Sequence, residues 1–223
     1  EAHLAGGFFG QFKDVPAIVC GAGPSLNKNI DVLKNLTDKA LIFAGGSSMN
    51  ALNAHNILPH FGLGIDPFSG QLTRIIMNTA FEVPFIYGNR LFHNATKLLH
   101  GPKLYATTSS GYTITTWLDE QLGINSEKIE EGCNIVNMSC SIARQLGCNP
   151  IIVVGCDMAY SEGESYATGI VSHAVHDAKK DVITKNPQEE VLIRNDIYGK
   201  PVYTLWKWMI ESFWYTLFQE HNP

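Results

Sequence analysis

Apolar residues gather in six short runs along the chain, and each run predicts a β-strand. Turn residues such as glycine, proline, asparagine and aspartate bound the runs. They span residues 16–20, 40–46, 60–66, 83–88, 103–108 and 150–157. Several are apolar at every position rather than at alternate positions, which is typical of parallel strands that are covered on both faces.

Helical patterns separate several of these runs. Helices are predicted at residues 30–36, 47–57 (with Ser47 or Ser48 as N-cap), 134–147 and 201–219, the last being long and rich in aromatic residues. Strands that alternate with helices predict a Rossmann-like α/β fold, a doubly wound, mostly parallel sheet with helices on both faces. Ligands bind such sheets beyond the carboxyl ends of the strands, so the residues that follow each strand are the candidate site.

The composition narrows the class of protein. The 223 residues are 45% hydrophobic and 17% charged, which favours one domain spanning 1–223 with a large core. The net charge is -5 and no Lys or Arg cluster occurs, so we expect no nucleic-acid partner. No apolar run reaches the roughly 18 residues of a membrane span. Five cysteines without a CxxC pair favour reduced thiols in a cytoplasmic protein.

Two features concern the limits and loops of the chain. The first residues lack a basic segment typical of a secretion signal, and the last ones stop abruptly, which predicts a domain cut from a longer chain. Residues 161–200 are polar with weak periodicity, and we expect a long excursion or lid there.

A glycine-rich turn follows the first predicted strand. It consists of Gly21, Ala22, Gly23, Pro24 and Ser25. Glycines allow positive φ and close approach of the backbone to a ligand, and the N–H groups of the helix that follows attract anions. The turn is neither a GxGxxG nor a Walker A motif. It favours a phosphate or nucleotide site, with a plain strand-to-helix turn as the alternative.

Acidic residues end two other predicted strands, Asp66 in Gly-Ile-Asp-Pro and Asp157 in Gly-Cys-Asp. An acid at a strand end can bind a metal, a ribose hydroxyl or a nucleophile, or can simply begin a turn. If the two strands are neighbours, the carboxylates can hold Mg²⁺ between phosphates.

Hydroxyl and amide side chains provide further candidates. Thr108, Ser109 and Ser110 follow the fifth strand and can bind a phosphate or cap a helix. Asn134, Asn137 and Ser139 open the next helix and can bind a base or sugar, or serve as caps. His173 and His176 lie in the polar excursion, where a histidine is either a solvated loop residue or a catalytic base.

Three stretches together resemble the MptE-like domain: residues 18–34, 63–67 and 132–160. The resemblance covers roughly residues 14 to 220. Its archaeal members are 6-hydroxymethylpterin diphosphokinases, and its bacterial members include the motility accessory factors, glycosyltransferases implicated in placing nonulosonic acids on flagellin. The pattern is also distantly similar to bacterial sialyltransferases that use CMP-activated sugars.

The resemblance implies roles for particular residues. Gly21, Gly23, Pro24 and Ser25 would line the nucleotide phosphates, and Asp66 would lie beside the ribose or a metal. Asn137, Ser139 and Asp157 would line the same cleft. The sialyltransferases use a histidine downstream of the last of these strands as base, and His173 occupies the corresponding region here.

The expected function is therefore that of a nucleotide-binding transferase. The first expectation is a glycosyltransferase that uses a CMP-activated nonulosonic sugar, with His173 and Asp157 as catalytic residues. The alternative is an ATP-dependent 6-hydroxymethylpterin diphosphokinase, whose Mg²⁺ Asp66 and Asp157 would hold. A third possibility is a nucleotide-binding module without catalysis. The expected partners are a nucleotide or nucleotide-sugar and an acceptor that is a protein, a glycan or a pterin.

Overall fold

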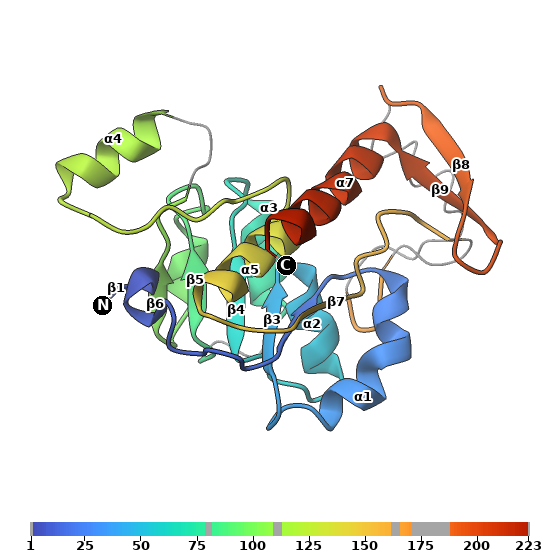
Figure 1. Ribbon diagram of the computed structural model, residues 1–223, viewed down its shortest axis with the longest axis horizontal. Coiled ribbons are helices and arrows are strands. Elements are labelled where there is room, and N and C mark those ends of the chain that lie inside the picture. Colours follow the sequence, from blue (N-terminus) through green and yellow to red (C-terminus); the bar gives the residue numbers. More distant parts are fainter. Residues whose placement is uncertain (1, 79–81, 109–112, 162–165, 171–187, 223) are drawn as a thin grey trace.

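The computed structural model describes residues 2–78, 82–108, 113–161, 166–170 and 188–222 (Figure 1). Seven strands in this part of the chain form one sheet in the order β1-β6-β5-β4-β3-β2-β7, and all six neighbouring pairs are parallel. The strands are β1 (Ala2–Leu4), β2 (Ala17–Cys20), β3 (Leu41–Gly45), β4 (Phe61–Gly64), β5 (Phe85–Tyr87), β6 (Lys103–Tyr105) and β7 (Ile151–Val154). The predicted α/β fold with a parallel sheet is confirmed.

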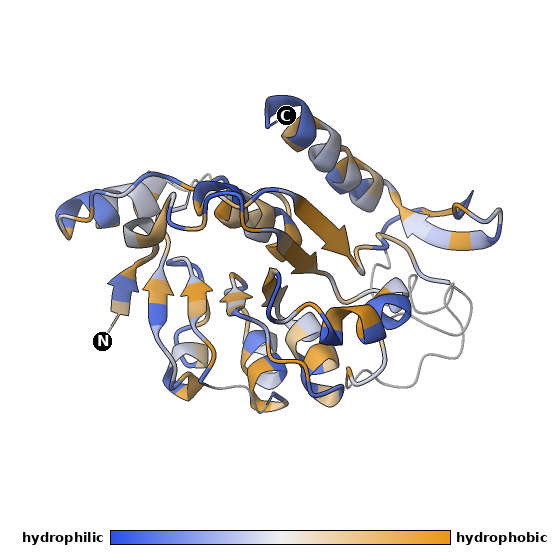
Figure 2. Ribbon diagram, turned by 60° about the horizontal axis from the view of Figure 1, so that its bottom comes forward, coloured by the Kyte–Doolittle hydropathy of each residue, from blue (hydrophilic) through white to orange (hydrophobic). Residues whose placement is uncertain are grey.

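Helices cover both faces of this sheet, as Figure 2 shows. The helical elements are η1 (Ala5–Phe8), η2 (Pro24–Asn29), α1 (Ile30–Lys34), α2 (Ser47–Ala54), α3 (Gly70–Ile76), η3 (Ala95–Leu98), α4 (Thr113–Gln121), α5 (Ile135–Gln145) and α7 (Trp206–His221). Residues of α1, α2 and α3 belong to one buried cluster, and residues of α5 and α7 belong to another.

Successive residues of one strand enter opposite clusters. In β2, Ile18 packs with α1 and α2, whereas Val19 packs with α5. Successive side chains of a strand point to opposite faces of the sheet. Because helices cover both faces, both side chains are buried. This arrangement explains why the strand sequences are apolar at every position.

The strand β7 differs from this pattern. Its sequence is highly apolar, yet it forms an edge of the sheet and pairs with β2 alone among the described strands. Ile152 is 46% exposed and Val153 is 36% exposed. An apolar run therefore predicted the strand correctly but did not reveal its position at an edge.

The predicted helix at 201–219 begins later than expected. Residues Pro201–Leu205 form the strand β9, which pairs antiparallel with β8 (Val191–Asn195) in a separate hairpin, and α7 starts at Trp206. Val202, Tyr203 and Thr204 are residue types that favour strands, and Pro201 lies at a strand start where its missing N–H is tolerated. The hairpin also occupies part of the predicted excursion at 161–200.

The order of the strands in the sheet predicts a crevice at the carboxyl ends of β2 and β7. From β2 the chain adds β3, β4, β5 and β6 in succession on one side, and then returns to place β7 on the other side of β2. The strand order thus reverses at the β2–β7 pair. In open parallel sheets, this switch point is where ligands bind.

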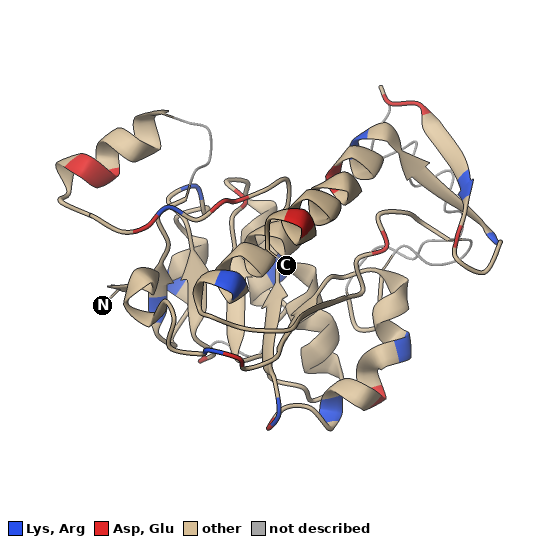
Figure 3. Ribbon diagram, in the orientation of Figure 1, with Lys and Arg blue, Asp and Glu red and all other residues tan. Residues whose placement is uncertain are grey.

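Charged residues are dispersed over the described chain rather than gathered on one face (Figure 3). No helix among these residues combines the length and apolar character that crossing a membrane requires.

Candidate functional site

A cavity of about 400 Å³ lies at the carboxyl ends of the central strands. Its walls come from the segments that follow β2, β3, β4 and β7, from the start of α5, and from α3 and α7. These segments are Cys20–Gly23, Gly45–Ser47, Gly64–Asp66, Gly155–Tyr160 and Asn134–Val136, with Gln71, Arg74, Tyr166, Trp208 and Glu211. The cavity lies where the topology predicts a ligand site.

The glycine turn after β2 packs tightly against the loop after β7. Gly21 N donates to Val154 O at 2.8 Å, and Gly23 N donates to Gly155 O at 2.7 Å. A Cβ on Gly21 would lie 2.8 Å from the Gly155 carbonyl carbon, and a Cβ on Gly23 would lie 2.9 Å from Gly155 O and would overlap the Asp157 carboxylate. Gly23 has a φ of −71°, so the turn needs this glycine for close approach and not for positive φ.

The Asp157 carboxylate occupies the start of η2. Its Oδ2 accepts a hydrogen bond from Ser25 N at 2.8 Å, and its Oδ1 accepts one from the Ser25 hydroxyl. A carboxylate that accepts from the first N–H groups of a helical turn satisfies donors that have no partner within the helix. The N–H group of Ser25 is therefore already bonded to an anionic group of the protein.

The loop after β7 adopts the conformation that this contact requires. Gly155 has a φ of 69° and Met158 has a φ of 49°, both in the left-handed region. Thr204 of β9 donates to Met158 O at 2.7 Å. The hairpin thus supports the backbone directly after Asp157, although a methionine is rare in this conformation.

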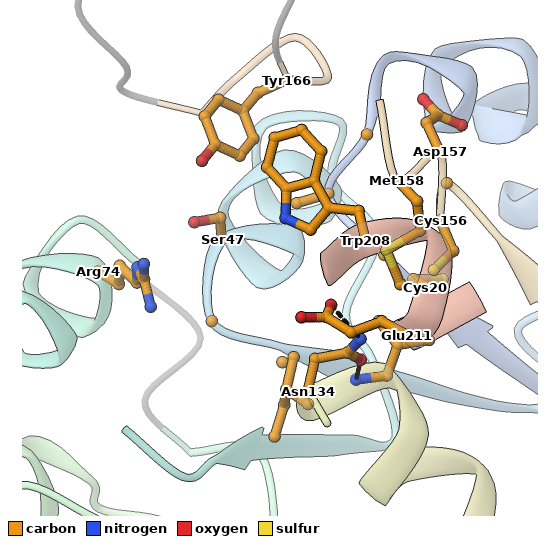
Figure 4. A pocket seen from close by; sticks show the side chains of 18 of the residues that line it. Cys20, Ser47, Arg74, Asn134, Cys156, Asp157, Met158, Tyr166, Trp208 and Glu211 are labelled. Atoms are coloured by element: carbon orange, nitrogen blue, oxygen red, sulfur yellow. Dashed lines mark hydrogen bonds between the residues drawn. The ribbon is translucent and has the colours of Figure 1, made fainter. Parts of the chain in front are cut away.

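On the opposite side of the cavity, Arg74 pairs with Asp66. Arg74 Nη1 lies 2.6 Å from Asp66 Oδ2, and both side chains are a little under half exposed. Figure 4 shows Arg74 across the cavity from Asp157. The two predicted acidic residues therefore line one cavity but contact different partners.

The wall contributed by α7 carries an aromatic ring and a third carboxylate. Trp208 stands between Tyr166 and the strand ends, and Glu211 points into the cavity near Asn134 (Figure 4). Asn134 caps α5 by accepting from Val136 N and Asn137 N, and its Nδ2 donates to Glu211 Oε2 at 3.3 Å. Burial raises the pKa of the Glu211 carboxyl. The hydrogen bond from Asn134 and the charge of Lys207 act in the opposite direction, but the effect of burial is larger.

Two cysteines also line the cavity, Cys20 and Cys156. Burial raises the pKa of Cys20 to about 12, and it also raises the pKa of Cys156, whose Sγ lies 3.1 Å from Tyr215 Oη. Both are therefore neutral thiols at neutral pH. Because the thiolate is the reactive form, neither is suited to act as a nucleophile.

Several residues predicted for the site lie elsewhere. Pro24 and Ser25 line a second cavity of about 770 Å³, between η2 and the β8–β9 hairpin, which shares Asp157, Met158, Ala159 and Trp208 with the first. Thr108 is buried and bridges to Ile129. Ser109, Ser110, His173 and His176 lie outside the described residues.

The two polar residues predicted within α5 make contacts inside the protein. Asn137 is fully buried, and its Oδ1 accepts from Cys133 N at 3.0 Å. Ser139 Oγ donates to Ile135 O at 2.7 Å, within its own helix. Neither side chain lines the cavity. Their proposed ligand contacts stay a prediction.

The short described segment 166–170 is attached to the sheet domain. Ala167 is 3% exposed, and its N–H donates to Ala22 O at 3.0 Å. Thr168 N donates to Asn27 Oδ1 at 3.0 Å. This part of the predicted excursion therefore packs on the glycine turn and on η2.

The cavity as it stands does not fit a preformed Mg²⁺ site. A divalent ion needs several free oxygen ligands. Asp66 is paired with Arg74, and Asp157 is bonded to Ser25. Among the described residues, no three His, Cys, Asp or Glu side chains cluster closely enough to hold a metal ion.

Sequence reasoning missed several residues of this cavity, among them Gln71, Arg74, Tyr166, Trp208 and Glu211. The pattern at 201–219 predicted only a helix, and nothing in it distinguished a cavity-facing Trp208 from a core aromatic. Arg74 lies eight residues after Asp66 on a short helix that was not predicted. The position of a strand end in sequence does not reveal which distant helix faces it.

Comparison with known proteins supplies the family. The profile described as "6-hydroxymethylpterin diphosphokinase MptE-like" matches residues 2–163. The chain belongs to the MptE-like family. The match includes every lining residue of the cavity except Tyr166, Trp208 and Glu211.

Solved structures also resemble this MptE-like chain. The MAf glycosyltransferase from Magnetospirillum magneticum AMB-1 superimposes with a TM-score of 0.62 at 16% sequence identity. The match covers 89% of this chain and 28% of that protein, so the chain spans less than a third of its structural relative. At this identity the likeness shows a common fold. No individually curated protein sequence matches the chain.

Proposed function

We propose that the cavity at the switch point binds a nucleotide-activated sugar and that the protein is a glycosyltransferase. The observation that carries the proposal is the cavity of about 400 Å³ at the reversal of strand order, which the glycine turn and Trp208 both line. An indole ring offers a surface on which a base or sugar can stack. The glycosyltransferase fold of the structural relative supports this choice.

The donor we propose is a CMP-activated nonulosonic sugar, as the family resemblance implies. In the reaction, an acceptor hydroxyl oxygen bonds to the anomeric carbon while the bond from that carbon to the phosphate oxygen breaks. CMP leaves with the electron pair of that bond, and a general base takes the hydroxyl proton. The second cavity, which borders Asp157 from the other side, is the proposed entry for the acceptor.

The base has two candidates, His173 and Glu211. His173 is the candidate from the family resemblance. Glu211 has geometric support, because it faces the cavity and its carboxylate accepts a hydrogen bond from Asn134 Nδ2. Its raised pKa moves it toward the range in which a carboxylate is an effective base. Asp157 is the less suitable base because Ser25 donates to both of its oxygens.

A binding panel tests the function. Thermal unfolding is measured with CMP, CDP, UDP, GDP and ATP, each with and without Mg²⁺. A specific ligand at 100 times its Kd raises the free energy of unfolding by about 2.7 kcal/mol. We expect CMP to stabilise the protein without Mg²⁺. The rate of CMP release from a CMP-sugar is then compared for the wild type, His173→Ala and Glu211→Gln.

The family description keeps the diphosphokinase as a second candidate. In that reaction the hydroxyl oxygen of 6-hydroxymethylpterin bonds to the β-phosphorus of ATP, the bond from that phosphorus to the α–β bridging oxygen breaks, and AMP leaves. Since the described carboxylates do not form a preformed Mg²⁺ site, this route requires Asp66 or Asp157 to leave its present partner. Binding of ATP only with Mg²⁺, and no binding of CMP, would replace the glycosyltransferase proposal with this one. CMP binding without any turnover would indicate a nucleotide-binding module.

A further inference from the structure

Charges are unevenly distributed around the cavity at the switch point. Asp157 and Glu211 lie on the walls made by the β7 loop and α7, and Arg74 is the only Lys or Arg among the described residues that line the cavity. An anionic ligand group is repelled by the first two walls, whereas on the third wall Arg74 is paired with Asp66 at 2.6 Å. Arg74 is therefore the cationic side chain that an anion in this cavity can contact, in competition with the Asp66 carboxylate.

The glycine turn is a poor competitor for that anion. Ser25 N, at the start of η2, already donates to Asp157 Oδ2 at 2.8 Å, and the Ser25 hydroxyl donates to Oδ1. A phosphate placed there would have to displace a carboxylate or lie beside its negative charge. Two charges of equal sign a few ångströms apart repel strongly in a partly buried site.

The wall with Arg74 contains a helix N-terminus instead. α2 begins at Ser47, its N-cap is Gly46, and no side chain caps it. Ser48 Oγ bonds to Gly45 rather than to the helix amides. A Cβ on Gly46 would lie 3.8 Å from Arg74 Cδ, which places the arginine stem directly over this helix start. The positive end of the helix and the guanidinium therefore face the same space.

An unpartnered donor marks the same place. Gln71 lines the cavity and is only 2% exposed. Its Oε1 accepts from Arg74 Nη1 at 3.5 Å, while its Nε2 has no hydrogen-bond partner among the described residues. A buried amide N–H without an acceptor is costly, and a bound anion would supply the acceptor.

We propose that Arg74, Gln71 and the N-terminus of α2 form the anion subsite of the cavity, and that the anionic oxygens of the ligand bind there rather than on the glycine turn. The chemistry recognised is an oxyanion, either the phosphate of a nucleotide or the carboxylate of an acidic sugar. Asp66 acts as the counter-ion that Arg74 releases or shares when the oxyanion arrives. This inference rests on the proposed function, because the oxyanion is taken to belong to the nucleotide-sugar.

The test measures binding of CMP, cytidine and free N-acetylneuraminic acid by calorimetry. The variants are Arg74→Met, Gln71→Met, Asp66→Asn and Ser25→Ala. Arg144→Met is the matched control, since it removes the same charge from an exposed position on α5 that does not line the cavity. Circular dichroism establishes that each variant is folded, and Arg74→Lys gives a second variant if the methionine variant does not fold.

If the phosphate occupies the subsite, Arg74→Met should weaken CMP by about 10- to 100-fold and leave cytidine unchanged. If the sugar carboxylate occupies it, Arg74→Met should weaken N-acetylneuraminic acid and leave CMP unchanged. In either case Gln71→Met should weaken the same ligand, Asp66→Asn should tighten it, and Arg144→Met should have little effect. Unchanged binding of both ligands in Arg74→Met, with weaker CMP in Ser25→Ala, would overturn the subsite and leave the glycosyltransferase proposal standing.

A protein that binds none of these ligands would contradict the proposed function, and inorganic pyrophosphate then tests the subsite by itself. Stabilisation by pyrophosphate that is lost in Arg74→Met but kept in Arg144→Met would support the subsite. The subsite would be overturned if pyrophosphate stabilised all variants equally, or if it did not stabilise the wild type.

Discussion

Contacts between single residues of two loops shape the wall of the cavity beside β2. Gly23 has an ordinary φ of −71°. The position requires glycine because there is no room for a side chain. A Cβ there would lie 2.9 Å from Gly155 O and would overlap the Asp157 carboxylate. The glycine therefore allows Asp157 to reach Ser25.

Gly23→Ala is expected to destabilise the protein by about 1–3 kcal/mol, because the loops after β2 and β7 must separate to admit the methyl group. The free energy of unfolding in urea measures this. Gly70→Ala is the matched control, since a Cβ at Gly70 meets no atom within 4 Å. If Gly23→Ala is as stable as Gly70→Ala, the close packing of the two loops is not as described.

At the scale of elements, a side chain completes the pairing of β3 with β4. His60 precedes β4, its backbone N donates to Ile42 O at 2.8 Å, and its Nδ1 accepts from Ile42 N at 3.0 Å. The acceptor role requires a neutral Nδ1. Burial lowers the pKa of His60 from 6.5, although a backbone hydrogen bond involving Thr37 acts in the opposite direction.

The two strands should therefore be less stable in acid. Below about pH 6.5 the unfolded chain binds a proton at His60, while the folded chain, with its lower pKa, resists protonation. The contribution of neutral His60 to the free energy of unfolding should be fully present above pH 6.5. It should decrease as the pH falls from there toward the pKa of His60 in the folded protein. Urea unfolding between pH 7.5 and 5.5 measures the slope, and His60→Gln, which cannot titrate, should show a shallower one. Equal slopes for the two proteins would show that His60 does not contribute.

At the scale of the molecule, the two hydrophobic clusters share the strands of one sheet. Ile42 belongs to the cluster with α1 and α2, Ile86 belongs to the cluster with α5, and both are almost fully buried. Because the strands β3 and β5 are held by the same ladder through β4, loss of one cluster exposes the other face as well. The sheet should unfold as one unit.

Ile42→Val and Ile86→Val make the same change on opposite faces of the sheet. Each should lower the free energy of unfolding by about 0.5–1.5 kcal/mol in a single transition. Fluorescence and circular dichroism, followed through urea unfolding, should give coincident curves for both variants. A separate, earlier transition in only one of them would show that the two faces unfold independently.

The amino-acid sequence by itself determined the class of fold and the place of the cavity. Runs that are apolar at every position specify strands that are covered on both faces. A glycine directly after Cys20 and Val154, and Asp66 two residues after Gly64, mark the carboxyl ends of three of them. Parallel strands bring these ends to one edge of the sheet, so local patterns were enough to predict that residues 21–23, Asp66 and Asp157 line one cavity. The segment 201–205 was predicted incorrectly because its strand depends on a partner, β8, that is not visible in local periodicity.

Only the tertiary structure decided what each of these residues contacts. Asp157 lies 132 positions after Ser25 in the sequence, and no local pattern reveals that its carboxylate accepts from the turn that was expected to bind phosphate. Arg74 and Gln71 come from a short helix with little periodicity of its own, and Trp208 and Glu211 come from the far end of the chain. Hydrogen bonds and charge interactions act over a few ångströms of space without regard to sequence separation. For that reason the sequence located the cavity, whereas the folded chain decided which side chains on its walls are already paired with each other.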